Sequence, residues 1–202
     1  MTGWRHHTGK AAVLPMENID TDQLIPARFM STPRKDGYGN YLLHDLRFDE
    51  IGTPKEPPWS IDGTSVLVAR RNFGCGSSRE AAVYALVDFG IQAVIAPSFG
   101  DIFAGNAVNN GLLPAQIDEA FCDALLSGLA ADQAELTVDL EASEITLGEL
   151  RGAFTLDSVW RLKLINGWDD IDLTASRADA IDAFAADYRV RSPWTWPADA
   201  SR

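Results

Sequence analysis

Residues 74–80, Gly-Cys-Gly-Ser-Ser-Arg-Glu, have the types and the spacing that a carboxylate or phosphate site requires. The two glycines permit positive φ and let the backbone come close to a ligand. The helix predicted to follow presents unpaired N–H groups and the positive end of its dipole. Arg79 adds a planar guanidinium that can bind a carboxylate through two hydrogen bonds. This segment, called the serine loop below, is therefore the main candidate for a functional site.

The spacing of the serine loop also allows a purely structural role. Ser77 and Glu80 are placed as in a capping box, and glycine-rich loops commonly join strands to helices. Spacing alone supports a structural and a functional role equally well. Two familiar cofactor motifs are excluded, because a dinucleotide loop would need glycine where Arg79 stands and a P-loop would need Gly-Lys before its Ser or Thr.

Cys75 offers a second kind of chemistry, as a nucleophile. A thiol at a helix N-terminus beside an arginine would have a lowered pKa. It would still need a base, and that role rests on His44, because His6 and His7 are expected in a frayed N-terminus. A cysteine-dependent hydrolase therefore stays open as an alternative. Cys122, on an apolar helix face, is predicted to be a core residue.

Two further groups of polar residues precede the serine loop in the chain. Asp20 and Asp22 have the chemistry to bind a hard cation, but carboxylates in such turns more commonly accept hydrogen bonds from the local backbone. Arg28 can reach a substrate carboxylate or pair with one of the many acids of the chain. No metal ligand is predicted among these residues.

A strand, loop, helix and strand are predicted in that order around the serine loop. Residues 65–69 are apolar and β-branched, as in a strand buried on both faces, and the helix runs from about residue 78 to 89 and stops at Gly90. Residues 92–96 make a second buried strand, which completes a βαβ unit with two parallel strands.

The remaining elements complete a single α/β domain over residues 1–202 with a mixed sheet. Residues 31–60 are rich in Pro and Gly and are predicted to be a long loop excursion. The other predicted elements are a strand at 11–15, a helix within 99–110, a helix around 121–129, a hairpin over 136–147, and a closing amphipathic helix that begins with Ser176 and Asp179.

Composition excludes several classes of function. Seventeen Lys and Arg against 29 Asp and Glu give a formal charge of −12, which disfavours nucleic acid and anionic membranes as partners. The longest apolar run, 81–87, is far shorter than the roughly 20 residues of a membrane span. With no signal-peptide core either, a cytoplasmic location is expected. Two cysteines are also too few to hold an iron–sulfur cluster, which needs three or four thiolates.

Several motifs in one order resemble the small subunits of 3-isopropylmalate dehydratases, the swivel-domain half of the aconitase superfamily. The resemblance covers about residues 10–188. Besides the serine loop, the motifs are 18–26 (Asn-Ile-Asp-Thr-Asp-Gln-Leu-Ile-Pro), 96–103 (Ala-Pro-Ser-Phe-Gly-Asp-Ile-Phe), 109–114 (Asn-Asn-Gly-Leu-Leu-Pro) and 166–174 (Asn-Gly-Trp-Asp-Asp-Ile-Asp-Leu-Thr). The implied fold is a swivelling β/β/α domain, which is compatible with the predicted parallel βαβ unit and hairpin.

The resemblance implies a division of labour between two chains. A large subunit holds a four-iron, four-sulfur cluster through its own cysteines, and the small subunit closes over it with the serine loop. The small subunit would then bind no cofactor itself. The implied reaction interconverts 2-isopropylmalate and 3-isopropylmalate through isopropylmaleate, by dehydration and rehydration, in leucine biosynthesis.

The resemblance also implies roles for individual residues. Ser77 stands at the position of the catalytic base, which acts as an alkoxide, and Arg79 at the position that binds a substrate carboxylate. Ser78 and Gly76 are expected to add hydrogen-bond donors to the substrate, and Arg28 a second cationic contact. Because an alkoxide lies far above neutral pKa, it would need the helix terminus and nearby positive charge.

Two departures from the family pattern bear on these implications. Ala81 stands where many relatives carry His, and Cys75 stands where aconitase relatives carry Glu. The loop at 31–45, expected to sense the side chain of the substrate, does not decide between isopropyl and other groups. Related hydro-lyases acting on citraconate, methylmalate or homoaconitate therefore stay open, and so does a non-catalytic carboxylate-binding module.

Overall fold

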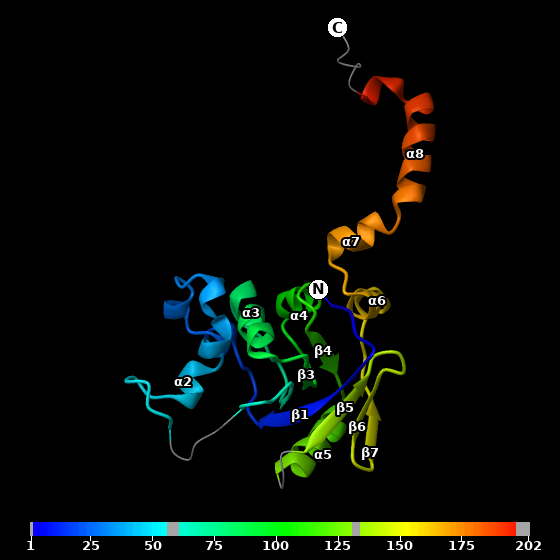
Figure 1. The fold of residues 1–202 in the computed structure, drawn as a ribbon. Coiled ribbons are helices and arrows are strands. Elements are labelled where there is room, and N and C mark those ends of the chain that lie inside the picture. The colour runs from blue at the N-terminus through cyan, green and yellow to red at the C-terminus, as the bar shows by residue number, and fades with distance from the viewer. Residues whose placement is uncertain (1, 56–60, 131–133, 197–202) are drawn as a thin grey trace. The chain divides into compact units, whose positions relative to one another are not determined.

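A computed structural model describes residues 2–55, 61–130 and 134–196. The chain divides into two compact units, Met1–Trp168 and Asp169–Arg202, which are described separately. The first unit contains the sheet, and the described part of the second contains helices, coloured orange to red in Figure 1. The single domain expected over 1–202 concerns both units together and stays a prediction.

A seven-stranded mixed sheet, in the order β4-β3-β2-β1-β5-β6-β7, forms the centre of the first unit. Strand β1 belongs to both halves of it: Ala11–Leu14 pair in parallel with β2, and His6–Lys10 pair antiparallel with β5. The strands are β1 (His6–Leu14), β2 (Val66–Ala69), β3 (Ala93–Ala96), β4 (Leu113–Gln116), β5 (Glu135–Asp139), β6 (Glu144–Leu147) and β7 (Leu150–Ala153).

Helices and short 3-10 turns surround this sheet. The α-helices are α1 (Thr21–Leu24), α2 (His44–Arg47), α3 (Glu80–Phe89), α4 (Asp101–Asn109), α5 (Glu119–Ala130) and α6 (Ser158–Asn166). The 3-10 turns are η1 (Ala27–Phe29), η2 (Arg34–Asp36) and η3 (Tyr38–Tyr41). Figure 1 shows α3 and α5 on opposite sides of β1, as expected for a parallel sheet with both faces covered.

The two faces of the parallel strands pack into separate cores, because successive side chains of a strand point to opposite sides. One core joins the sheet to α1, α3 and the segment that leads to Leu43, and the other joins it to α5 and β5–β7. The first core takes Ala12, Leu14, Leu67, Ala69, Val94 and Ala96, and the second takes Ala11, Val66, Val68, Ala93 and Ile95.

Most predicted elements are confirmed. The βαβ unit is present as β2, α3 and β3, with parallel pairing, and α3 ends at Gly90, whose φ is +106°. The predicted hairpin is β5 and β6. In the predicted excursion at 31–60, residues 31–55 hold only elements of three or four residues. Its residues 56–60 lie outside the described residues.

The expected frayed N-terminus is wrong. Strand β1 begins at His6, and a hydrogen bond of 2.7 Å joins His7 Nε2 to Ser65 Oγ. Residues 6–10 carry no apolar alternation, so only their pairing with β5, about 130 positions later in the chain, makes them a strand. The structure also contains β4, which sequence patterning missed because Pro114 lies within it. That proline is tolerated since β4 is an edge strand.

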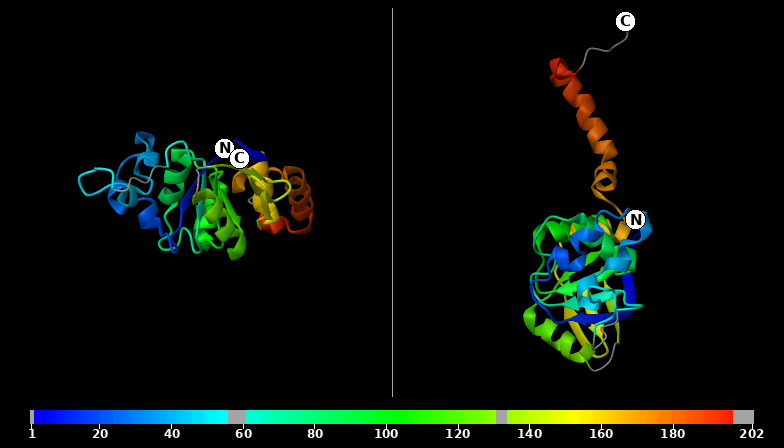
Figure 2. Two further views of the ribbon diagram at one scale, coloured as in Figure 1. Left: turned by 90° about the horizontal axis from the view of Figure 1, so that it is seen from below. Right: turned by 90° about the vertical axis from the view of Figure 1, so that its left-hand side faces the viewer.

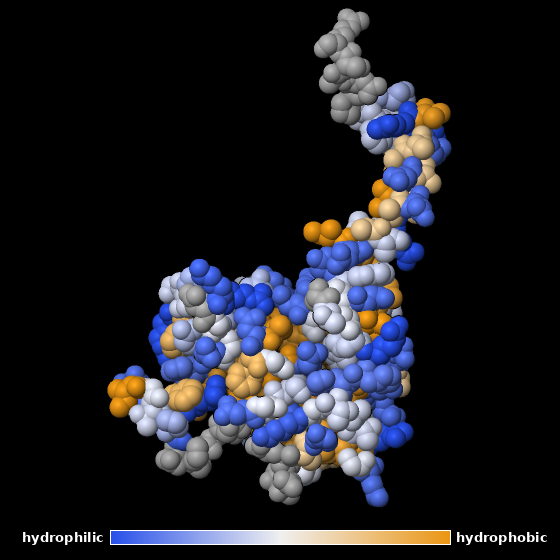
Figure 3. All heavy atoms as spheres, viewed as in Figure 1, coloured by the Kyte–Doolittle hydropathy of each residue, from blue (hydrophilic) through white to orange (hydrophobic). Residues whose placement is uncertain are grey.

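The second unit contains α7 (Asp170–Ala175), α8 (Ala178–Arg191) and η4 (Pro193–Thr195), seen from two further sides in Figure 2. The closing helix is therefore confirmed, but its predicted start at Ser176 is wrong, because Ser176 is the C-cap of α7 and α8 begins at Ala178. Hydrophobic side chains lie on the surface of α8 (Figure 3). Among them, Phe184 is 61% exposed. Among the described helices, none is both long and apolar enough to cross a membrane.

Candidate functional site

The serine loop lies between β2 and α3. Gly74 and Gly76 have φ of +72° and +92°, the left-handed region that favours glycine. Helix α3 begins at Glu80, two residues later than predicted, and its N-cap Arg79 makes no side-chain capping bond. The predicted capping pair of Ser77 and Glu80 is therefore not formed. Ser77 precedes the helix and is exposed, so capping does not account for it.

The motif at 18–26 lies against the serine loop. The Gly74 N–H donates to the Ile19 carbonyl oxygen at 2.7 Å, and the Thr21 N–H donates to the Cys75 carbonyl oxygen at 3.0 Å. The Thr21 hydroxyl donates to the Ser77 carbonyl oxygen, also at 3.0 Å. Hydrogen bonds thus join two motifs that are separated by about fifty residues in the sequence.

The motif at 96–103 lies against the start of the same loop. The Gly100 N–H donates to the Phe73 carbonyl oxygen at 2.9 Å, and the Phe73 N–H donates to the Ser98 carbonyl oxygen at 3.0 Å. The approach is close enough that a Cβ on Gly100 would lie 2.6 Å from the Gly74 carbonyl oxygen. Glycine at position 100 is therefore required by the contact between the two segments.

These three motifs enclose one cavity of about 260 Å³. The serine loop contributes its two serines and its arginine to the lining, and the start of α4 also contributes residues. The cavity is lined by Thr21, Gly74, Cys75, Gly76, Ser77, Ser78, Arg79, Gly100, Asp101, Ile102, Phe103 and Asn106. Of the residues predicted to bind or transform a substrate, the structure thus brings Gly76, Ser77, Ser78 and Arg79 together.

Arg79 is held at the cavity by Asp22. Its guanidinium donates to the Asp22 carboxylate, and the Arg79 side chain is 27% exposed. Asp20 caps α1, since its carboxylate accepts from the Gln23 N–H at 2.8 Å while the Gln23 side chain accepts from the Asp20 N–H. Local hydrogen bonding therefore accounts for Asp20, as expected, and Asp22 orients a guanidinium.

The thiol of Cys75 lacks the activation that a nucleophile needs. Burial and the nearby Asp20 carboxylate raise the pKa of Cys75, so the thiolate is disfavoured. Its candidate base, His44, is not among the residues that line the cavity. Cys122 is a core residue, as predicted: burial raises its pKa to about 11, and its thiol donates to the Ala69 carbonyl oxygen.

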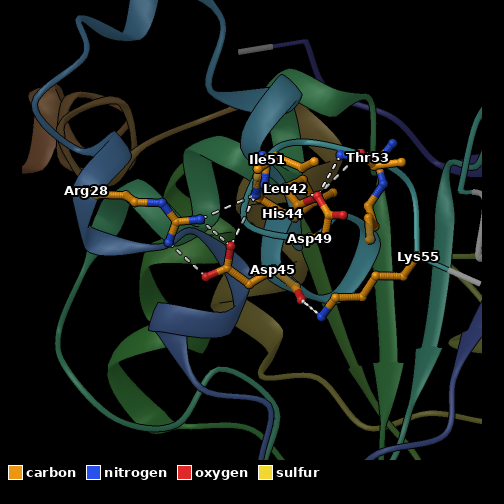
Figure 4. A network of polar contacts seen from close by, with 9 residues as sticks. Arg28, Leu42, His44, Asp45, Asp49, Ile51, Thr53 and Lys55 are labelled. Carbon is orange, nitrogen blue, oxygen red and sulfur yellow. Dashed lines mark hydrogen bonds and ion pairs between the residues drawn. The ribbon is translucent and has the colours of Figure 1, made fainter.

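Arg28 lies in a different hollow, lined by Arg28, Asp45, Phe48, Asp49, Glu50 and Lys55. Figure 4 shows both terminal nitrogens of its guanidinium directed at the Asp45 carboxylate, with Nη1 and Oδ2 2.8 Å apart. The His44 ring also contacts this pair, through Nδ1 at 3.1 Å from Asp45 Oδ1. The structure therefore does not place Arg28 at the cavity, and its contact with a substrate stays a prediction.

The ion pair of Arg28 and Asp45 makes stability depend on acid pH. The hydrogen bond from Arg28 lowers the pKa of Asp45 from 3.8 to about 2. The pair is thus fully stabilising above pH 3.8 and is lost as the pH falls through about 2. We expect Asp45→Asn to lower the urea midpoint slightly at pH 7, because exposed pairs contribute little, and by less at pH 2, where about half of the Asp45 carboxylate is protonated. An equal loss at both pH values would contradict this assignment.

Sequence reasoning missed two kinds of cavity residue. Thr21 belongs to a recognised motif, but only the fold shows that its hydroxyl reaches the serine loop. Asp101 and Asn106 lie on α4 and line the same cavity as the serines. Asp101 belongs to the motif at 96–103, which could have marked it as a candidate site residue. Asn106 lies between two motifs, so nothing in the sequence marked it.

Gly74 is the glycine of the loop with the least tolerance for a side chain. A Cβ there would lie 2.2 Å from the Phe103 ring, which is buried against Phe73. We expect Gly74→Ala to lower the free energy of unfolding by about 2–5 kcal/mol, from backbone strain and overpacking, measured by urea denaturation.

Gly63 provides the control for this substitution. It has the same φ, +72°, but nothing lies within 4 Å of its Cβ position. Gly63→Ala should therefore cost only about 1–2 kcal/mol of backbone strain. Equal losses for the two variants would show that the contact with Phe103 is unimportant.

The residues of this chain do not fit an iron–sulfur cluster. The sequence has two cysteines, and one of them, Cys122, is buried in the core. Over residues 2–55, 61–130 and 134–196, the structure has no group of three or more His, Cys, Asp or Glu side chains that is arranged to hold a metal ion.

Comparison with known proteins gives consistent results for the family. The protein-family model of the aconitase C-terminal domain matches residues 1–120 of the sequence. The 3-isopropylmalate dehydratase small subunits of Shewanella baltica strains OS185 and OS195 are each 47% identical to this chain over 186 residues. The alignments cover 88% of this chain and 92% of each relative.

A solved structure agrees with the architecture. The crystal structure of a 3-isopropylmalate dehydratase (LeuD) from Methanocaldococcus jannaschii matches with a TM-score of 0.65 and 28% identity, over 88% of this chain and 98% of that chain. The predicted α/β fold of the aconitase swivel domain is thereby confirmed. Since close relatives match over most of its length, the chain belongs to the family of 3-isopropylmalate dehydratase small subunits.

Proposed function

We propose that this chain is the small subunit of an enzyme that interconverts 2-isopropylmalate and 3-isopropylmalate by dehydration and rehydration, in leucine biosynthesis. The observation that carries the proposal is the convergence of Ser77, Ser78 and Arg79 on one cavity, walled by the other two motifs. The names of the relatives that are 47% identical support the substrate.

The geometry of the cavity suits removal of a proton from a carbon atom of the substrate that lies next to a carboxylate. Arg79 is the cation of the cavity wall and binds a carboxylate of the substrate through its two-donor fork. Ser77 takes the proton from the adjacent carbon as an alkoxide. Backbone N–H groups before α3 and the positive end of that helix favour the negative charge on its oxygen. Gly76 and Ser78 supply further hydrogen bonds to the substrate.

A large subunit completes the site. The cavity of about 260 Å³ is smaller than the roughly 300–1,000 Å³ of complete ligand sites, as expected for half of a site. A four-iron, four-sulfur cluster belongs to that large subunit, because this chain lacks the thiolates for one. Departure of hydroxide is likewise assigned to the large subunit. The chain alone is expected to be inactive, and its location cytoplasmic.

Reconstitution tests this function. The chain is mixed anaerobically with a cluster-loaded large subunit of a 3-isopropylmalate dehydratase. The absorbance of the unsaturated compound is followed as it forms from 2-isopropylmalate or methylmalate, and as it is consumed by hydration when homoaconitate is the substrate. Turnover of 2-isopropylmalate by the mixture, and by neither subunit alone, is expected. Dehydration by this chain alone, or a preference for methylmalate or homoaconitate, would contradict the proposal.

A further inference from the structure

Thr21 joins the motif at 18–26 to the serine loop from a buried position. The residue is 2% exposed. Its N–H donates to the Cys75 carbonyl oxygen and its hydroxyl to the Ser77 carbonyl oxygen, both at 3.0 Å. One buried residue thus holds the serine loop at two carbonyl groups, two positions apart in the sequence.

The contact at the Ser77 carbonyl affects the position of the Ser77 hydroxyl, because the carbonyl group and the side chain are attached to the same Cα. Once the direction of the carbonyl is fixed, only three staggered positions remain for the Ser77 Oγ. Helix α3 begins at Glu80, so Ser77 lies outside its ladder of hydrogen bonds. Gly76, just before it, has no Cβ to restrict the backbone. The direction of the chain at Ser77 therefore depends on a contact from outside the loop.

We propose that the Thr21 hydroxyl is a positioning group for the catalytic serine, and that it orients the Ser77 main chain so that Oγ reaches the proton of the substrate. The inference rests on the proposed function, in which Ser77 is the base. A misplacement of about 1 Å can cost a reaction about 100-fold in rate. Arg79 is held separately by Asp22, so the binding of the substrate carboxylate does not depend on Thr21.

Thr64 is a matched control for a buried hydroxyl. It is 3% exposed, close to the value for Thr21, and its Oγ1 has no hydrogen-bond partner within the described part of the chain. Thr64→Val therefore removes a buried hydroxyl that does not hold the serine loop. Thr21→Val removes the contact with Ser77 at nearly constant volume, and Thr21→Ser keeps it.

Steady-state kinetics of the reconstituted complex give the first test. With 2-isopropylmalate, Thr21→Val should lower kcat about 10- to 100-fold and leave KM nearly unchanged, because a contact that matters only in the transition state acts on kcat. Thr21→Ser should restore most of kcat, and Thr64→Val should behave as wild type. Unchanged kcat in Thr21→Val, or an equal loss in Thr21→Ser, would overturn the proposal.

The rate at which iodoacetamide alkylates Cys75 in the isolated full chain gives a second test that needs no turnover. Cys122 is buried and its pKa is about 11, so Cys75 is the thiol that reacts. Thr21→Val should speed this alkylation several-fold, because the loop opens more often, and Thr64→Val should not. Equal rates in Thr21→Val and wild type would overturn the proposal, even if the wild-type complex proved inactive on isopropylmalate and the proposed function failed.

Discussion

Replacing Ser77 with alanine is expected to lower kcat of the reconstituted complex by about 10²–10⁴-fold, the usual contribution of a general base. The fold should be unaffected. Ser77 is exposed and caps no helix, and Thr21 contacts its main chain, which alanine keeps. The free energy of unfolding should therefore change by no more than about 0.5 kcal/mol. The measurements are kcat with 2-isopropylmalate and urea denaturation of the chain.

Cys75→Ala separates this assignment from thiol chemistry. The raised pKa of Cys75 opposes a role as nucleophile, so this variant should keep substantial activity. Wild-type kcat in Ser77→Ala would reject the serine as base. An inactive Cys75→Ala that still assembles with the large subunit would instead support the cysteine-dependent alternative.

Replacing Arg79 with lysine is expected to lower kcat/KM by about 10- to 100-fold, which corresponds to the 1.5–3 kcal/mol of a hydrogen bond to a charged group. Lysine keeps the positive charge but loses the planar fork that binds a carboxylate through two donors. It also loses the geometry with which Asp22 orients the guanidinium at the cavity. Kinetics with 2-isopropylmalate measure the effect.

Arg70→Lys is the matched control. Arg70 is also paired with a carboxylate, that of Asp123 at 2.7 Å, and its side chain is 33% exposed against 27% for Arg79. It does not line the cavity. Its replacement should leave kcat/KM near the wild-type value. Unchanged kinetics in Arg79→Lys would mean that another group binds the carboxylate of the substrate.

The parts of the fold that were predictable from sequence depend on local information. The strands β2 and β3 and the helix between them follow from short runs of apolar residues, and Gly90 marks the end of the helix. The first half of β1 did not, because its conformation depends on a partner about 130 positions later in the chain, and neither did β4, which pairs with β3 at the edge of the sheet. Pro114 also argues against a strand until its place at the edge of the sheet is known.

The candidate site also has parts that could be predicted from local sequence and parts that could not. The serine loop was found because Gly74, Ser77 and Arg79 are neighbours in sequence and their chemistry is complementary. The contact of Thr21 with the loop joins positions 56 residues apart, so spacing could not show it. Arg28 was assigned to the substrate from its place beside a motif, but a carboxylate 17 residues away decides where its guanidinium lies.

Strand β1 pairs with β2 along one half and with β5 along the other, and this has a consequence for synthesis on the ribosome. All four parallel strands are complete once Gln116 has emerged, whereas the first half of β1 pairs with a strand that begins at Glu135. For roughly 1–4 s of translation, a nascent sheet therefore has an open edge at His6–Lys10. Natural proteins protect such edges from unwanted pairing with charged side chains, lysine above all. Lys10 and the polar residues before it would keep the growing chain from aggregating until its proper neighbour arrives.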